Sequence, residues 1–183
     1  MTHLDALCHV AWDGMTYNGR RFRETVSAAN GCVKNAVAPM KHGIATRGVL
    51  VDIESRGRVG REDIEAWEKK TNLRISAGDA LVLRKTRNGG YDLKSVMPWL
   101  KERDVAMLLA DGTVETGSVP GRTTLPVHVF TLVSLGMPLV DGIDLNAVAE
   151  TAGRLNRLDF LFVVAPLPVE NGVGSAVNPI ALF

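Results

Sequence analysis

The chain has 183 residues, of which 46% are hydrophobic and 22% are charged, as in one ordinary soluble globular domain. Its 21 basic and 20 acidic side chains leave a formal charge of +1, which excludes a general attraction to nucleic acids or acidic membranes. No apolar stretch approaches the roughly 18 residues of a membrane-spanning helix, and no signal peptide is recognisable. We therefore expect a single domain over residues 1–183 that binds neither nucleic acid nor membrane.

The first part of the chain, residues 1–47, is rich in glycine, asparagine and polar side chains. It has few periodic apolar positions, so periodicity indicates little about its structure. It contains Cys8 and Cys32, which are the only cysteines and too few for a disulfide scaffold. The cysteine content therefore favours a reducing compartment, and we expect the protein in the cytoplasm.

From Gly48 onward, short β-rich apolar runs alternate loosely with segments whose apolar residues have helical spacing. This alternation predicts a mixed α/β fold. The predicted elements, in chain order, are a strand at 49–53, a helix at 62–71, a strand at 80–83, a helix near 93–100, a strand at 105–109, a helix at 125–135, a helix from Asp144 and a strand at 159–165.

Several of these helices carry signals at their ends and on their faces. Ile64 and Trp67 share the expected buried side of the first helix. Pro98 lies inside the apolar pattern of the second, which either starts late, near a Ser95 cap, or kinks. Thr124 is expected to cap the third. The apolar face of the last helix comprises Leu145, Val148, Ala149, Ala152 and Leu155.

The segment from His3 to His9 has the pattern His-x-Asp-x-x-x-His, with Asp5 between the two histidines. In an extended strand, side chains alternate between faces, so positions 3, 5 and 9 would project to the same side. Two imidazoles and a carboxylate on one face suit Zn²⁺ or Mn²⁺. The alternative interpretation is that these are exposed polar residues near a chain terminus.

Four further features are open to two interpretations each, and a fifth has none. His128 lies on a predicted helix among apolar residues and is either a ligand or a core histidine. Asp141 and Glu115 are each either a ligand or a turn former. The glycine-rich run Gly172–Ser175 is either an active-site loop or a plain turn, and it lacks the lysine of a phosphate-binding loop. His42 lies in a polar loop and receives no role.

The ordered set of these segments resembles the cyclase family, which includes bacterial kynurenine formamidases and isatin hydrolases. The hallmark of that family is a His-x-Gly-Thr-His-x-Asp-x-x-x-His motif. Thr2, His3, Asp5 and His9 match its second half. The other segments that fall in family order are 43–52, 78–84, 126–128, 136–141, 165–168 and 172–181.

The resemblance implies a role for each of the candidate site residues. It makes His3 and Asp5 metal ligands and His9 the general acid/base. His128 would bind the same metal or a second one. Asp141 falls where the family often has a glutamate ligand. The implied reaction is hydrolysis of a small-molecule amide, such as an N-formyl aryl amine or an isatin-like cyclic amide, with Zn²⁺ or Mn²⁺ as cofactor.

The resemblance also implies a fold, namely a mixed α/β domain of the swivelling β/β/α type with a central β-barrel-like sheet and peripheral helices. It implies a homo-oligomer as well. The substrate-binding residues are not identified by it. Against the family pattern, the N-terminal segment that carries the first histidine of the motif is missing, so we expect an N-terminally truncated domain.

The sequence departs from the family pattern at several positions. Met1 replaces the motif glycine, Val173 and Ala176 replace a threonine and a proline, and Lys85 and Thr86 interrupt an Arg-Thr-Gly signature. These departures support an alternative hypothesis. In that hypothesis the chain is a catalytically impaired homologue with a structural or oligomerising role.

Overall fold

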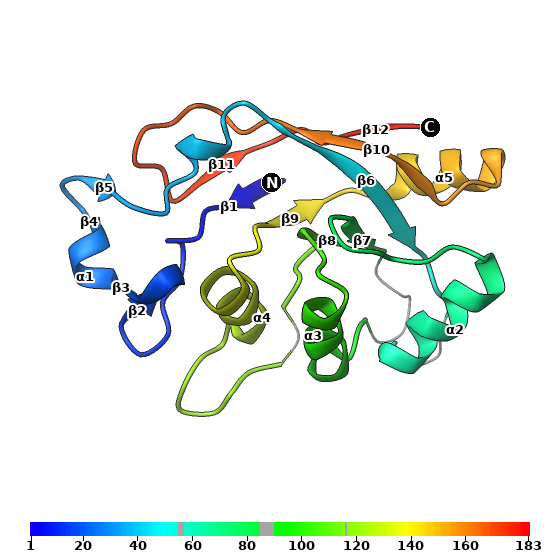
Figure 1. Ribbon diagram of the computed structural model, residues 1–183, viewed down its shortest axis with the longest axis horizontal. Coiled ribbons are helices and arrows are strands. Elements are labelled where there is room, and N and C mark those ends of the chain that lie inside the picture. Colours follow the sequence, from blue (N-terminus) through cyan, green and yellow to red (C-terminus); the bar gives the residue numbers. More distant parts are fainter. Residues whose placement is uncertain (55–56, 85–89, 116) are drawn as a thin grey trace.

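The computed structural model describes residues 1–54, 57–84, 90–115 and 117–183, so Lys85 and Thr86 lie outside the described residues. The centre of the fold is an eight-stranded mixed sheet with the strand order β11-β1-β9-β8-β7-β6-β10-β12 (Figure 1). Its strands are β1 (His3–Asp5), β6 (Ile44–Val51), β7 (Ala80–Leu83), β8 (Met107–Asp111), β9 (Leu139–Ile143), β10 (Asp159–Val164), β11 (Gly174–Ala176) and β12 (Ile180–Leu182).

Strands β6, β7, β8 and β9 run parallel, and every other pairing in this sheet is antiparallel. The parallel strands are joined by crossover segments that contain helices, as parallel pairing requires. The longer helical elements are α2 (Arg61–Thr71), α3 (Leu93–Glu102), α4 (Pro126–His128), its continuation as the π-helix η3 (Val129–Leu135), and α5 (Asn146–Leu155).

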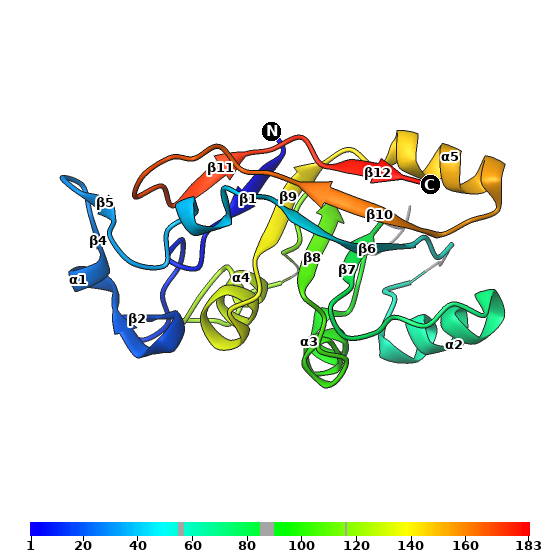
Figure 2. The same cartoon turned by 45° about the horizontal axis from the view of Figure 1, so that its top comes forward.

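The sheet curls into a half-barrel and separates two hydrophobic clusters (Figure 2). Because strand side chains alternate in direction, Leu81 and Leu83 pack with α2, α3 and α4, whereas Val82 packs with α5 on the other face. In the same way Leu4 belongs to the α5 cluster. Its neighbours His3 and Asp5 therefore face the side that carries α4.

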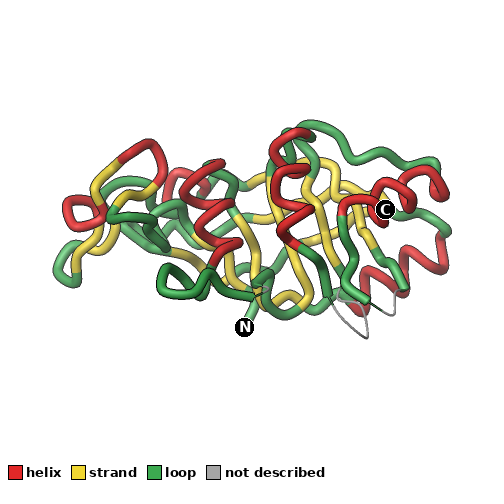
Figure 3. Tube along the Cα trace, turned by 90° about the horizontal axis from the view of Figure 1, so that it is seen from below, coloured by secondary structure: helices red, strands yellow, loops and turns green. Residues whose placement is uncertain are grey.

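Residues 15–40 form short elements at one end of an elongated molecule (Figure 3). They are β2 (Met15–Thr16), η1 (Tyr17–Gly19), β3 (Arg20–Arg21), α1 (Phe22–Thr25), β4 (Val26–Ser27), β5 (Gly31–Cys32) and η2 (Ala38–Met40).

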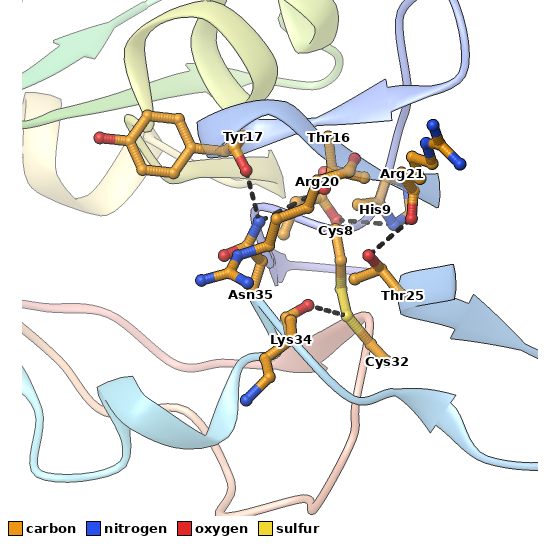
Figure 4. The surroundings of a disulfide bond; sticks show 11 residues. Cys8, His9, Thr16, Tyr17, Arg20, Arg21, Thr25, Cys32, Lys34 and Asn35 are labelled. Carbon is orange, nitrogen blue, oxygen red and sulfur yellow. Dashed lines mark hydrogen bonds and ion pairs between the residues drawn. A yellow bond between two sulfur atoms is a disulfide. The ribbon is translucent and has the colours of Figure 1, made fainter. Parts of the chain in front are cut away.

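A disulfide joins Cys8, in the turn after β1, to Cys32 on β5, with an S–S distance of 2.06 Å (Figure 4). Within residues 15–40, the Asn35 side-chain amide donates a hydrogen bond to the Tyr17 carbonyl at 2.9 Å. The two cysteines, too few for a scaffold, thus still fasten this end of the molecule to the turn that follows β1.

The structure confirms the mixed α/β class and the barrel-like sheet, and each predicted helix and strand is present. The strand at 80–83 has the predicted bounds, and the other elements differ from the prediction at one or both ends. Ile64 and Trp67 are buried as expected. The Ser95 cap is wrong, because α3 begins at Leu93 and the Asp92 carboxylate accepts from the Lys94 amide at 3.3 Å. Pro98 is accommodated inside that helix.

Two further expectations about helices are wrong. Thr124 does not cap α4, since the neighbouring Thr123 hydroxyl accepts from the Leu125 amide at 2.9 Å. Leu155 does not join the buried face of α5, because 45% of its surface is exposed at the last turn of the helix. In the described part of the chain, no helix has the length and apolar character needed to cross a membrane.

Candidate metal and catalytic site

Strand β1 carries the first two candidate ligands into the interior of the sheet. It pairs with β9 on one side, where His3 lies opposite Asp141, and with β11 on the other, where His3 lies opposite Ala176. This register brings the start of the chain beside residues more than a hundred positions later. The predicted common face of His3 and Asp5 is therefore present, and Asp141 shares it.

His9 reaches the same place by a different route from the expected one. The strand ends at Asp5, and a turn follows in which the His9 amide donates to the Ala6 carbonyl at 2.9 Å. The turn brings His9 Nδ1 to 3.7 Å from Asp5 Oδ1. The three motif side chains are thus neighbours, although an extended strand through His9 was the wrong reason to expect it.

Asp5 lies at the centre of the cluster and is completely buried. Among the described residues, neither of its carboxylate oxygens has a hydrogen-bond partner. Three imidazoles surround it: Nε2 of His128 is 3.2 Å from Oδ2, while Nε2 of His3 and Nδ1 of His9 are 3.6 and 3.7 Å from Oδ1. A buried carboxylate without donors is costly, so this position calls for a positive charge, either a protonated imidazole or a metal ion.

His128 is the buried histidine of the cluster and is held between carboxylates. Its Nδ1 is 2.6 Å from Glu115 Oε1, and its Nε2 faces Asp5 and is 3.5 Å from Asp141 Oδ2. Burial lowers the pKa of His128, but the close carboxylates of Asp5 and Glu115 and the charge of Asp141 outweigh it and raise the pKa to about 9. Without a metal, His128 is therefore the cation that compensates the buried acids.

Asp141 is also buried, and burial raises its pKa above the usual value. The opposing influences are the Val114 amide, which donates to Oδ1 at 2.7 Å, and the charge of His128. Asp141 lies on β9 rather than in the turn that the sequence suggested. Its carboxylate faces His128 and is oriented by the loop that follows β8.

Glu115, which the sequence left open between ligand and turn former, contacts His128 instead of lying free in the loop. No spacing rule links a glutamate in a loop to a histidine thirteen positions later. The only sequence feature that pointed toward this contact was an isolated acidic residue in the loop after a buried strand. This contact was the part of the cluster that sequence reasoning missed.

The donor types of the cluster suit a divalent metal, since Zn²⁺ and Mn²⁺ take imidazole nitrogen and carboxylate oxygen. The partnerless oxygens of Asp5 are the structural observation in favour of a cation there. Within the described ranges, however, no three His, Cys, Asp or Glu side chains are arranged to hold a metal ion as they stand. The cluster therefore fits a metal in chemistry, and completing the coordination requires side-chain adjustment.

The remaining candidates lie elsewhere. His42 is exposed in its loop. The run Gly172–Ser175 is no free loop, because β11 begins within it and the Val173 carbonyl accepts from the Ala6 amide at 3.1 Å. A cavity of about 480 Å³ lies on the opposite side of the sheet, against α5 and β12, and its lining includes none of the cluster residues.

A family model described as "Putative cyclase" matches residues 1–116. A crystal structure of "a novel cyclase" superposes with a TM-score of 0.84 at 27% identity, over 100% of this chain and 68% of that one. Isatin hydrolase A from Ralstonia solanacearum gives a TM-score of 0.63 at 17% identity, over 97% and 69% of the two chains.

A predicted metal-dependent hydrolase from Bacillus stearothermophilus gives a TM-score of 0.57 at 15% identity, over 97% of this chain and 74% of that one. At these identities, the two hydrolases show a shared fold. No protein of curated function matches the sequence.

Proposed function

Because the chain belongs to the cyclase family, we propose that it is a metal-dependent hydrolase that cleaves a C–N amide bond in a small molecule. The observation that carries this proposal is the buried Asp5 carboxylate, surrounded by three imidazoles and without a hydrogen-bond donor in the described structure. The structural similarity to proteins named isatin hydrolase and metal-dependent hydrolase supports it.

In this proposal His3 and Asp5 would hold a Zn²⁺ or Mn²⁺ ion, and His128 and Asp141 would bind the same ion or a second one. When bound, such an ion makes water more acidic and polarises the carbonyl group of the substrate. The two oxygens of Asp5 face different imidazoles, Oδ1 toward His3 and His9 and Oδ2 toward His128.

His9 is the proposed general acid/base. Its side chain is 35% exposed, whereas that of His128 is only 6% exposed, so His9 is the imidazole beside Asp5 that a substrate can reach from solvent together with His3. Its Nδ1 lies 3.7 Å from Asp5 Oδ1. The centroids of the His9 and His128 rings are 6.1 Å apart.

The proton balance is simple. His9 accepts a proton from water as the water oxygen adds to the carbonyl carbon, and it returns that proton to the nitrogen as the C–N bond breaks. The products are a carboxylic acid, which loses its remaining proton to solvent to become a carboxylate, and an amine, or one ring-opened molecule with both groups when the amide is cyclic. No other residue of the cluster has to change its protonation in this sequence.

Metal analysis combined with an activity assay tests the function. We expect the purified protein to hold Zn²⁺ or Mn²⁺ in stoichiometric amount and to hydrolyse a member of a panel of N-formyl aryl amines and isatin-like cyclic amides. A folded protein that binds neither ion after incubation with excess metal would exclude the proposal.

The role of His9 is tested by its replacement with alanine. We expect His9→Ala to lower kcat by about 10²- to 10⁴-fold while the metal content stays unchanged, because His9 acts on protons rather than as a ligand. His42→Ala is the matched control, since His42 is an exposed histidine outside the cluster. Equal turnover in His9→Ala and the wild-type protein would refute the assignment.

A second candidate function is a non-catalytic role in which the protein acts as a structural or oligomerising module. The observation in its favour is that no three described side chains are arranged as a metal site. The pKa of His128, raised to about 9, allows the cluster to be neutralised by a proton instead. A folded, metal-free and inert homo-oligomer is the result expected under this second candidate.

A further inference from the structure

We propose that the segment Thr113–Glu115 is a clamp that positions the second half of the site. Glu115 fixes the ring of His128, and the Val114 amide fixes the carboxylate of Asp141. As a result, His128 Nε2 and Asp141 Oδ2 face the same space beside Asp5, 3.5 Å from one another. The clamp itself is a matter of geometry, and only its effect on metal binding rests on the proposed function.

Glu115 receives three N–H groups from one short stretch of chain. Its Oε1 accepts from the backbone amide of His128 at 2.9 Å and lies 2.6 Å from Nδ1 of the same residue. Its Oε2 accepts from the Val127 amide at 3.2 Å. The carboxylate thus holds both the backbone and the ring of His128, and the ring cannot rotate without breaking its shortest contact.

The ring contact also decides which nitrogen points into the site. A carboxylate at Nδ1 keeps a proton on that nitrogen, so that Nε2 is the atom presented to Asp5 and Asp141. Histidines that bind metals commonly donate their other ring N–H to a carboxylate in this manner, and this partner fixes the tautomer and the orientation. Glu115 is a positioning residue in this sense, because it acts through His128.

The same three-residue segment orients Asp141. The Val114 amide donates to Asp141 Oδ1 at 2.7 Å, which leaves Oδ2 directed toward His128. The Thr113 hydroxyl stabilises the clamp locally, since it accepts from the Glu115 amide at 3.2 Å. Consecutive residues thus set the directions of two side chains that come from different elements, α4 and β9.

A simpler interpretation is that Glu115 only caps the first turn of α4 through the two backbone amides. Two substitutions separate the interpretations. Glu115→Gln keeps an oxygen at the Oε1 position for the ring but places an amide group against the Val127 N–H. Glu115→Asp keeps the negative charge near the start of α4 but shortens the side chain by one methylene, which withdraws the carboxylate from Nδ1.

The first measurement is nuclear magnetic resonance of the chelator-treated protein with ¹⁵N-labelled histidine. We expect a His128 Nδ1 proton that is shifted downfield and protected from exchange with water, assigned by its loss in His128→Asn. The signal should persist in Glu115→Gln and disappear in Glu115→Asp and Glu115→Ala. Glu150→Ala, which removes an exposed carboxylate on α5, is the control and should leave the signal unchanged.

The second measurement is the affinity for zinc, by competition with a chromophoric chelator. We expect a loss of about 10- to 100-fold in Glu115→Ala and Glu115→Asp, and a smaller loss in Glu115→Gln. If Glu115→Ala does not fold, Glu115→Asp decides the question. A protected His128 Nδ1 proton that persists in Glu115→Asp would overturn the clamp. Loss of that proton in Glu115→Asp with unchanged zinc affinity would overturn it as well. A wild-type protein that binds neither zinc nor manganese would instead overturn the proposed function, and the ring proton would still decide the clamp.

Discussion

Two buried carboxylates in this molecule differ in their surroundings, and the difference separates structural acids from functional ones. Asp79 accepts from Nε and Nη2 of Arg47 at 3.0 and 2.6 Å and from the Ser76 amide at 2.7 Å, so its charge is fully compensated within the fold. Asp5 is more deeply buried and has no donor in the described structure. An acid placed in this way costs stability unless a cation accompanies it, which makes Asp5 the residue that a structural role explains least.

The raised pKa of His128 predicts how the metal-free protein responds to pH. The folded-state pKa of about 9 lies above the ordinary value of 6.5, so the protonated ring stabilises the fold fully below pH 6.5. This contribution is lost as pH rises through about 9. We therefore expect the free energy of unfolding of the chelator-treated protein to fall between pH 7 and 10.

Urea unfolding of the chelator-treated protein at a series of pH values measures this dependence. In His128→Gln the fall over the same interval should be smaller, because the group that loses its proton is absent. An identical pH dependence in the variant and the wild-type protein would show that His128 is not the responsible group.

At the scale of single residues, the sequence was informative where one local rule applied. The period of a strand placed His3 and Asp5 on one face, and both lie there. The motif predicted that His9 lies near His3 and Asp5, but it did not predict the turn that brings His9 there. The contact between Glu115 and His128 depends on how the loop after β8 packs against α4, and no local sequence pattern predicts that packing.

Among the elements, strand β9 carries a glycine whose conformation and surroundings predict a clear effect of substitution. Gly142 has a φ of +68°, and a Cβ built there would lie 2.5 Å from the Met1 carbonyl oxygen. We expect Gly142→Ala to lower the free energy of unfolding by about 1 to 3 kcal/mol, because it adds backbone strain and a clash. It should also weaken metal binding, since the displaced residues directly precede His3.

Gly153 on α5 provides the matched control for this substitution. A Cβ at that position meets nothing within 4 Å, and no positive φ is required. Gly153→Ala should therefore raise the free energy of unfolding by up to about 1 kcal/mol. Chemical denaturation measures the free energy of unfolding of both variants. If Gly142→Ala leaves this free energy unchanged, residue Met1 is not held against β9.

The elements themselves were predictable in proportion to their length. The parallel strands β6, β7 and β8 and the helices α2, α3 and α5 have enough residues to show their period. Strands β1, β11 and β12 have three residues each, and a run so short does not by itself identify a strand in the sequence. These strands form because they pair with strands distant in the sequence, and that pairing exists only in the assembled sheet.

For the molecule as a whole, the disulfide between Cys8 and Cys32 is the feature that bears most on stability. It closes a loop with a sequence separation of 24 residues, for which chain entropy predicts a stabilisation of about 2 to 4 kcal/mol. We expect Cys8→Ser/Cys32→Ser to lose this amount in denaturant unfolding. Hydrogen exchange should increase in residues 10–31, with little change in α2, which lies at the other end of the molecule (Figure 1).

The disulfide also bears on the predicted cytoplasmic location, because disulfides persist mainly in oxidising compartments. Mass spectrometry of the protein alkylated during cell lysis would show whether the two thiols are paired in the cell. Alkylation of both cysteines would agree with the cytoplasmic prediction. A protected pair would point to an oxidising compartment.

The position of β1 between β9 and β11 has a consequence for the order of events during synthesis. The residues of the motif leave the ribosome before their neighbours in the sheet, which are residues 139–143 and 174–176. A nascent chain that has reached residue 116, where the match to the family model ends, already contains His3, Asp5 and His9 but neither His128 nor Asp141. The motif therefore cannot pair with its neighbours in the sheet until they have been synthesised, and the cluster can close only after residue 141 has emerged.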